Sequence, residues 1–199
     1  MKRKNIIRQN IIQLLLALII VILIGYISSF VFFRLDLTSE KRYTLSDYTK
    51  NMLQHLDDDV FIKIYLEGED LPIGFKRMQR AIKEKLDDFE AYANTGFDYR
   101  LIDPFESEDK KVRDKMFQEL TVNKRLEPIE IKAGSKEGTK TLKIIPGAVV
   151  YYKGYEISVN LLKNNQTLSA EVNLNNSIES LEYEFTNAIQ KLQDRKSVV

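Results

Sequence analysis

Val60-Phe61-Ile62-Lys63-Ile64-Tyr65-Leu66 is the stretch that decides the fold, because it is a near-continuous apolar run of strand length and β-rich composition. Such runs are typical of strands in a parallel sheet. Apolar residues recur at helical spacing over 75–94, and residues 97–102 alternate as a second strand. We therefore expect strands 60–66 and 97–102 to be adjacent and parallel, with helix 75–94 as a right-handed crossover. Lys63 fits poorly, since a central strand should not bury an unpaired ammonium.

The remaining patterns predict one helix before this unit and several elements after it. The earlier helix begins at Thr44 and ends at Asp57-Asp58-Asp59, and another helix opens at Ser107. Strands are expected over 127–132, 141–145, 147–152 and 155–161, with Lys153-Gly154 as a hairpin turn between the last two, and a final helix is capped near Asn176.

This order predicts an α/β fold, in which an N-terminal transmembrane helix precedes one thioredoxin-like βαβαββα domain. Pro146 stands just before a hairpin strand, where that fold often keeps a cis proline, so it is the candidate cis-proline. The chain has no cysteine, which excludes disulfides, thiol catalysis, thiolate metal sites and a redox function. The analogy concerns the fold and carries no function.

Residues 11–33 form an uncharged, almost wholly apolar run, which as a helix of ~1.5 Å rise per residue is long enough to cross a bilayer. Four basic residues precede the run without any acid, and this bias places the N-terminus in the cytoplasm. We expect a protein of the bacterial inner membrane whose remaining chain lies in the periplasm. A cleaved signal peptide is the alternative, but its apolar core is usually ~7–15 residues and no small-x-small site follows.

The expected organisation has six parts. They are a cytoplasmic basic N-terminus (1–10), the transmembrane helix (11–33), a juxtamembrane connector (34–46), a thioredoxin-like extracytoplasmic α/β domain (47–167), a C-terminal helix that leads to a missing second domain (168–193), and an artificial tail (194–199). The tail matches the translation of a common sequencing-adapter string, which suggests a truncated gene product; a frayed basic C-terminus is the alternative.

Charge and composition exclude several classes of partner and site. Without its four N-terminal basic residues the chain carries 26 basic and 29 acidic residues, which gives no reason to expect nucleic acid as a partner. His55, the single histidine, lacks the convergent ligands that zinc requires. Asp57-Asp58-Asp59 lacks the spacing of a calcium loop. The sequence also holds no phosphate-binding glycine motif and no Ser-His-Asp arrangement, so we expect no catalytic residue, no cofactor and no metal.

Two features leave a functional alternative open. Asp103 follows the predicted strand 97–102, at the strand end where ligands bind in open α/β sheets, and is the candidate ligand residue. Its alternative role is to end the strand and cap the next turn. Tyr151, Tyr152 and Tyr155 flank the predicted hairpin turn and could contact a ligand or partner; the alternative is that they pack on the two faces of the sheet.

Several ordered fragments resemble a known family. They are 35–46 (LDLTSEKRYTLS), 65–68 (YLEG), 71–72 (LP), 74–77 (GFKR), 102–105 (IDPF), 146–150 (PGAVV) and 178–185 (IESLEYEF) with Ala188-Ile189. In order and spacing they resemble the N-terminal part of the GldG family, the gliding-motility-associated ABC-transporter auxiliary proteins of substrate-binding type. Each fragment is weakly specific alone, and together they cover nearly all of residues 1–193.

The resemblance implies a non-enzymatic, membrane-anchored auxiliary component of an ABC transporter, with the membrane and the permease and ATPase subunits as partners and an unknown substrate. It brings no catalytic residues. The alternative is a stand-alone periplasmic ligand-binding or scaffolding module anchored in the inner membrane. The connector is the candidate partner interface, and its alternative role is to set the angle of the domain on the membrane helix. Its candidate contact residues are Asp36, Thr38, Lys41, Arg42 and Tyr43.

Overall fold

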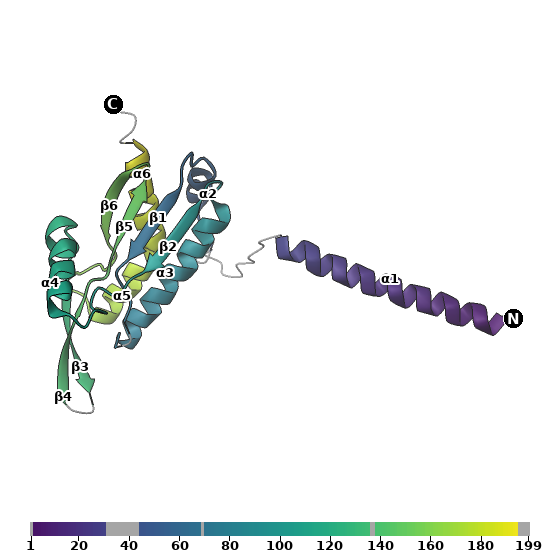
Figure 1. Ribbon diagram of the computed structural model, residues 1–199, viewed down its shortest axis with the longest axis horizontal. Coiled ribbons are helices and arrows are strands. Elements are labelled where there is room, and N and C mark those ends of the chain that lie inside the picture. Colours follow the sequence, from purple (N-terminus) through teal and green to yellow (C-terminus); the bar gives the residue numbers. More distant parts are fainter. Residues whose placement is uncertain (1, 31–43, 69, 136–137, 195–199) are drawn as a thin grey trace. The chain divides into compact units, whose positions relative to one another are not determined.

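A four-stranded mixed sheet forms the centre of the unit that spans Arg42–Val199. The computed structural model describes residues 2–30, 44–68, 70–135 and 138–194. The strand order is β2-β1-β5-β6 (Figure 1). The strands are β1 (Val60–Ile64), β2 (Phe97–Leu101), β5 (Gly147–Tyr152) and β6 (Tyr155–Asn160). β1 and β2 are parallel, which confirms the expected pairing, while β5 runs antiparallel to β1 and to β6.

Helix α3 (Ile73–Tyr92) connects the two parallel strands, as the periodicity predicts. Its apolar stripe turns toward the sheet and is almost completely buried. Burial of one such side chain contributes about 1.5–3 kcal/mol, so this stripe is a main source of the stability of the domain. The stripe comprises Phe75, Met78, Ile82, Leu86 and Phe89.

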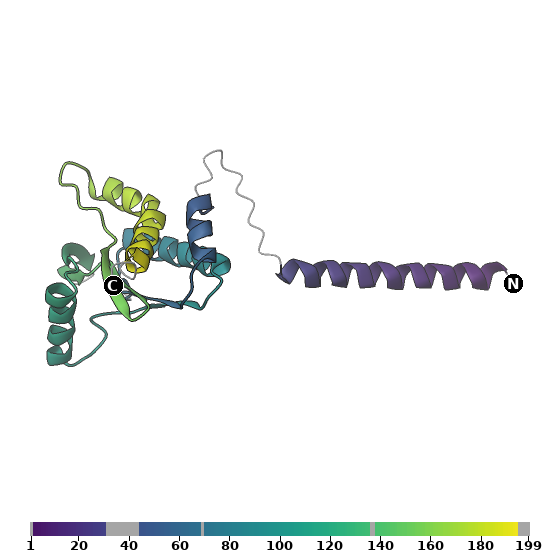
Figure 2. The same ribbon diagram turned by 90° about the horizontal axis from the view of Figure 1, so that it is seen from above.

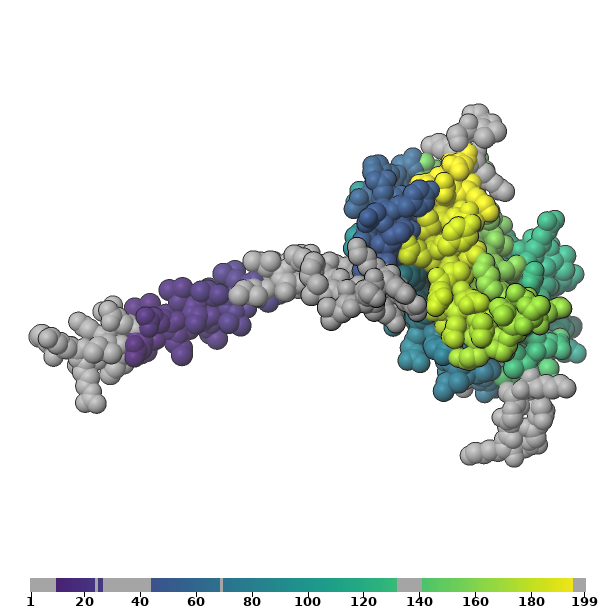
Figure 3. Space-filling model, turned by 180° about the vertical axis from the view of Figure 1, so that it is seen from behind, coloured from purple at the N-terminus to yellow at the C-terminus, as the bar shows by residue number. Residues whose placement is uncertain are grey.

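Three more helices lie on the same face of the sheet as α3. They are α2 (Asp47–Gln54), α5 (Ala170–Glu179) and α6 (Leu181–Asp194), and Figure 3 shows their outer surfaces side by side. The final segment is thus two helices, whereas the sequence predicted one that is capped near Asn176. The first begins earlier because the Ser169 side chain caps it by accepting from the Val172 N–H, and Ser180 separates the two. Likewise Ser46, and not Thr44, caps α2.

The opposite face of the sheet is covered only in part. α4 (Lys110–Gln118) continues into a π-helical turn, η1 (Glu119–Asn123), and Figure 2 shows the sheet between α4 and the helices α5 and α6. No residue of α4 is buried. The covering contacts come from a second, smaller core at η1 and the loop after it, whose buried residues are Tyr65, Leu120, Leu126, Ile145 and Val149.

A long hairpin, β3 (Ile129–Ser135) with β4 (Gly138–Ile144), extends away from the sheet and pairs only within itself in the part of the chain described (Figure 1). Pro146 follows the end of β4 by two residues, and a cis peptide bond was expected there. That prediction is wrong, because the described residues contain no cis peptide bond. Instead the Gly147 N–H donates to the Ile145 carbonyl at 2.8 Å, a three-residue turn that suits the fixed φ of a trans proline.

The first unit, Met1–Lys41, contains helix α1 (Lys2–Phe30). The sequence led us to predict a membrane-spanning helix over residues 11–33. That part of the fold-class prediction is wrong, because no helix among residues 2–30, 44–68, 70–135 and 138–194 is long and apolar enough to cross a membrane. The apolar run belongs to a longer helix whose first two turns are basic and polar, and residues 31–33 lie outside the described residues.

Candidate functional site

The side chains of β1 separate the two faces of the sheet, because successive residues of a strand point in opposite directions. Val60, Ile62 and Ile64 face the helices and are at most 1 % exposed. Phe61, Lys63 and Tyr65 face the other way. Tyr65 lies in the smaller core under η1, whereas Phe61 and Lys63 lie beyond its reach and are only half-buried.

Register brings three more side chains beside Phe61 and Lys63. Phe61 is paired with Asp98 on β2 and with Tyr151 on β5, and Lys63 is paired with Arg100. Paired residues share a face, so these five side chains lie on one exposed half of the sheet. We call this surface the open sheet face, and it consists of Phe61, Lys63, Asp98, Arg100 and Tyr151.

Rings and cations alternate on the open sheet face. The Phe61 and Tyr151 rings are tilted against each other with centroids 6.2 Å apart. The Lys63 ammonium lies 5.2 Å from the Tyr151 centroid, and the Arg100 guanidinium lies 6.0 Å from the Phe61 centroid. Contacts of this kind attract each cation to a ring at about 0.5–1 kcal/mol at exposed sites. They explain how a central strand accommodates Lys63: the ammonium rests on a ring at the edge of solvent.

Among the described residues, neither Lys63 nor Arg100 forms an ion pair. Other lysines of the domain do: Lys124 pairs with Glu156, Lys153 with Asp57 and Lys163 with Glu184. The open sheet face therefore presents two neighbouring positive charges that contact aromatic rings, together with the exposed carboxylate of Asp98. Ammonium and guanidinium groups are hydrogen-bond donors without acceptor capacity, so this surface is suited to hold an anion.

One border of the open sheet face is a charged cluster at β6 and η1. The Glu156 carboxylate accepts from Lys124, and this hydrogen bond raises the pKa of the Lys124 ammonium. Burial raises the pKa of the Tyr151 hydroxyl, and the negative charge of Glu156 raises it further. Beneath the cluster, burial raises the pKa of Tyr65 to about 12. Both phenols are therefore neutral at ordinary pH, and the cluster is held by the Lys124–Glu156 pair.

Another polar cluster joins the helices on the opposite face. The Glu182 carboxylate accepts from the Ser46 N–H and from the Thr49 hydroxyl, both at 2.8 Å, and lies 3.7 Å from the Lys85 ammonium. Burial alone would raise the pKa of Glu182, but these hydrogen bonds hold it below its usual value. This cluster fixes the start of α2 to α6 and α3, so it has a structural role.

Asp103, the candidate ligand residue, lies where the sequence placed it, just after β2. Its Oδ1 accepts from the Phe105 N–H at 2.8 Å, which is the turn-capping contact that the alternative reading described. The candidate partner residues Asp36, Thr38, Lys41, Arg42 and Tyr43 lie outside the described residues, so they remain predictions. No described contact brings Asp103 to the open sheet face.

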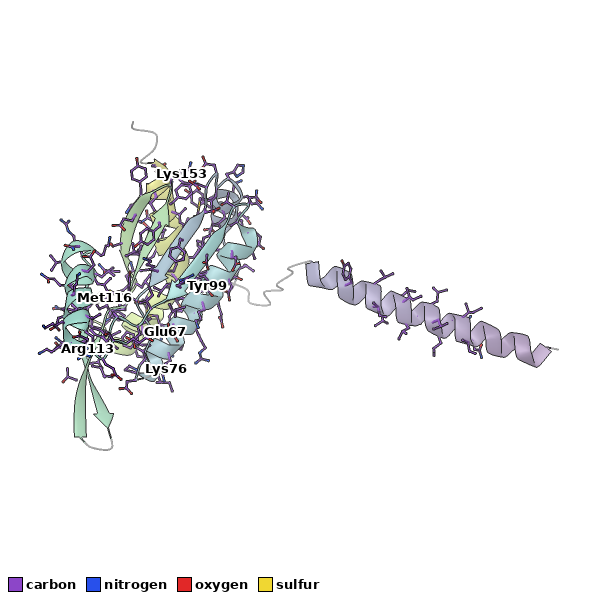
Figure 4. All side chains as sticks on the ribbon, viewed as in Figure 1. Glu67, Lys76, Tyr99, Arg113, Met116 and Lys153 are labelled. Atoms are coloured by element: carbon purple, nitrogen blue, oxygen red, sulfur yellow. The ribbon has the colours of Figure 1, made fainter. Side chains whose placement is uncertain are left out.

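The three tyrosines near the hairpin turn separate as alternation requires. Tyr152 is buried in the main core, Tyr151 belongs to the open sheet face and Tyr155 is exposed. The turn itself needs positive φ at both central residues, which Lys153 (52°) and Gly154 (76°) adopt. Figure 4 shows Lys153 at this end of the sheet and Met116 on α4, which lies beside the sheet.

His55 and the aspartates after it have ordinary roles in the fold. The His55 Nδ1 lies 2.7 Å from the Asn51 carbonyl at the end of α2. The Asp58 carboxylate accepts from the Asp59 N–H, and the Asp59 carboxylate accepts from the Gly96 N–H. In the described part of the chain no three His, Asp or Glu side chains are grouped to hold a metal ion.

Phe61, Lys63 and Arg100 could not be recognised as a group from the sequence alone. Lys63 stood out as the one charged residue in an apolar strand, whereas Arg100 was not singled out. Only the register of β1 with β2 shows that the two cations are neighbours. They would have been found by pairing the two predicted parallel strands and asking which charged residues then become neighbours.

Comparison with known families places this surface in a wider context. The sequence profile of a family described as a domain of unknown function (DUF7088) matches residues 39–151, more than half of the chain. The chain belongs to this family. No curated protein and no solved structure matches the chain. The matched part of this DUF7088 member includes β1, β2 and β5 up to Tyr151, and hence all five residues of the open sheet face.

Proposed function

We propose that this protein is a binding component without turnover of its own, and that it works as an auxiliary component beside the permease and ATPase subunits of an ABC transporter. The open sheet face is the surface through which it binds. The observation that carries this proposal is the pair of cations, Lys63 and Arg100, beside two half-buried rings and without an ion-pair partner among the described residues.

The open sheet face has the composition of a binding surface. Aromatic residues and Arg are enriched in the parts of interfaces that contribute most affinity, because rings lose little entropy when bound and Arg donates several hydrogen bonds in a fixed plane. The five side chains stand on three paired strands whose other face is buried in the main core. Side chains on such a rigid support are held in place before a partner arrives, which lowers the entropic cost of binding.

The transporter part of the proposal is supported by the resemblance of the chain to the GldG family. Two fragments of that resemblance meet at one end of the open sheet face, because residues 65–68 follow β1 directly and 146–150 include the start of the antiparallel β5. Binding without turnover is supported by the groups on the surface. Its cations donate hydrogen bonds and its rings contribute contact area.

Affinity purification of the tagged full chain from the cells that naturally produce it tests this function. Mild detergent extraction followed by mass spectrometry should recover a permease and an ATPase at constant ratios to the chain. An untagged strain is the control for non-specific capture. Recovery of the chain without either subunit, at several detergent strengths and after chemical cross-linking, would contradict the transporter proposal.

A further inference from the structure

We infer that the ligand of the open sheet face is an acidic, extended peptide segment of a partner protein. This inference rests on the proposed function, because it names the chemistry of the partner that the same surface binds. The segment places carboxylates on Lys63 and Arg100 and an apolar side chain on Phe61 and Tyr151.

The spacing of the two cations fits such a segment. Lys63 and Arg100 are register partners on neighbouring strands, which run about 4.8 Å apart. Carboxylates at positions i and i+2 of an extended chain project from one side, roughly 7 Å apart. The side chains of Lys63 and Arg100 are long enough to bridge the difference between the strand spacing and the carboxylate spacing. Carboxylates bind guanidinium and ammonium groups by charge-assisted hydrogen bonds, which are about twice as strong as neutral ones.

The rings favour a peptide over a bare anion. Phe61 and Tyr151 are half-buried and share one row of the sheet with Asp98 and Glu156, whereas Lys63 and Arg100 stand in the next row. A segment that alternates acidic and apolar residues can cover these rings while its carboxylates meet the cations. Covering the rings removes water from around the cation contacts, which strengthens them.

Charge argues against nucleic acid on this surface. Asp98 belongs to the open sheet face itself and is exposed, as is Glu156 at its border. The affinity of a phosphate backbone depends on neutralising several phosphates at once, whereas the open sheet face offers two cations. A peptide can instead present an amide or a basic residue to Asp98.

The β2 edge of the sheet, which adjoins Arg100, does not offer the same segment an alternative place. Gly96 and Ile102 form backbone hydrogen bonds with β1 on either side of β2, so the Tyr99 N–H between them points away from the sheet. The Asp98 carboxylate accepts from that N–H at 2.8 Å. An added strand would need this donor, so Asp98 blunts the edge and leaves the face as the docking surface.

Titration of the full chain with designed peptides tests this inference. The probes are a blocked decapeptide of alternating Glu and Val, the matched Gln and Val decapeptide, single-stranded oligothymidine and inorganic phosphate. We expect the Glu peptide to bind at least tenfold more tightly than the Gln peptide, to lose affinity as salt increases, and to shift the backbone amide resonances of Phe61, Lys63 and Arg100.

Charge reversal provides the matched control. K63E/R100E should weaken binding of the Glu peptide at least tenfold, whereas R80E/K83E, on exposed positions of α3, should leave it unchanged. Equal affinity for the Glu and Gln peptides, tighter binding of oligothymidine or phosphate, or no binding of any peptide would overturn the inference. Peptide binding without recovery of transporter subunits would instead leave the inference standing and contradict the transporter proposal.

Discussion

The two faces of the central sheet differ in the side chains that they carry, and the difference follows from what covers them. Toward the helices, β1 contributes Val60, Ile62 and Ile64, and every one of them is buried. Toward α4 the same strand contributes Phe61, Lys63 and Tyr65. There the covering layer is a short turn and loop, so only Tyr65 lies inside a core.

The comparison indicates that the residues of the open sheet face are suited to binding rather than to packing against another part of the domain. The side chain at position 63 points away from the main core, so an apolar residue there would not disturb the packing of that core. The chain instead keeps Lys63 beside Arg100, although two neighbouring cations repel each other. A repulsive pair on an otherwise well-packed sheet is typical of a binding surface, where function and stability make opposing demands.

Ile62 and Lys63 provide the strongest test, because they are consecutive residues on opposite faces. Ile62→Ala should lower the free energy of unfolding by about 2–5 kcal/mol, since the side chain is fully buried and its removal leaves a cavity. Lys63→Ala should lower it by less than about 1 kcal/mol. Urea unfolding followed by circular dichroism measures both. If the two variants lost similar amounts of unfolding free energy, positions 62 and 63 would not differ in burial as the structure shows.

Tyr65 tests the covered half of the same face. Burial raises its pKa to about 12, from 10 in the unfolded chain, so the folded state holds this proton more tightly. The stability that this provides is fully present below pH 10 and is lost as the pH rises from 10 through 12, by about 2–3 kcal/mol.

Chemical denaturation at a series of alkaline pH values measures that loss. Tyr65→Phe should remove the part of the pH dependence that Tyr65 contributes, while Tyr155→Phe, at an exposed position, should leave it unchanged. An unchanged alkaline profile for Tyr65→Phe would show that the ring is not held in a core.

Gly147 tests how closely the loop after η1 packs on the sheet. A Cβ at this position would lie 2.7 Å from Leu126 Cδ2, and Leu126 is only 1 % exposed, so it has little room to move. Gly147→Ala should therefore cost about 1–2 kcal/mol. Leu126→Ala relieves the clash, so the double variant should be more stable than the sum of the two single effects predicts. Additive effects would argue against this contact.

The parallel pair β1–β2 and helix α3 could be predicted because their signals are local and strong. A continuous apolar run, a helical apolar stripe and a second alternating run each extend over a whole element, and the right-handed crossover rule joins them. Element ends were less predictable. Ser169 starts α5 with one hydrogen bond and Ser180 separates it from α6, and a single side chain leaves little trace in a periodic pattern.

The candidate site could not be predicted because it depends on which residues meet. The apolar run 11–33 and the proline at 146 were interpreted from local sequence alone, and both interpretations were wrong. Lys63 and Arg100 are far apart in the chain, and their neighbourhood exists only through strand register. The sequence drew attention to Lys63 as a misfit in an apolar strand. Its partner on the surface became visible only when β2 was placed beside β1.

Capture of the natural partner by charge-reversed chains tests the central claim most directly, that the open sheet face is the binding surface. Tagged wild-type, K63E/R100E and R80E/K83E chains would be compared for recovery of the protein that co-purifies with the wild type, with thermal unfolding as the control for folding. We predict equal melting temperatures, at least a tenfold loss of partner with K63E/R100E, and no loss with R80E/K83E. Undiminished capture by a folded K63E/R100E chain, or equal losses with both variants, would contradict the account.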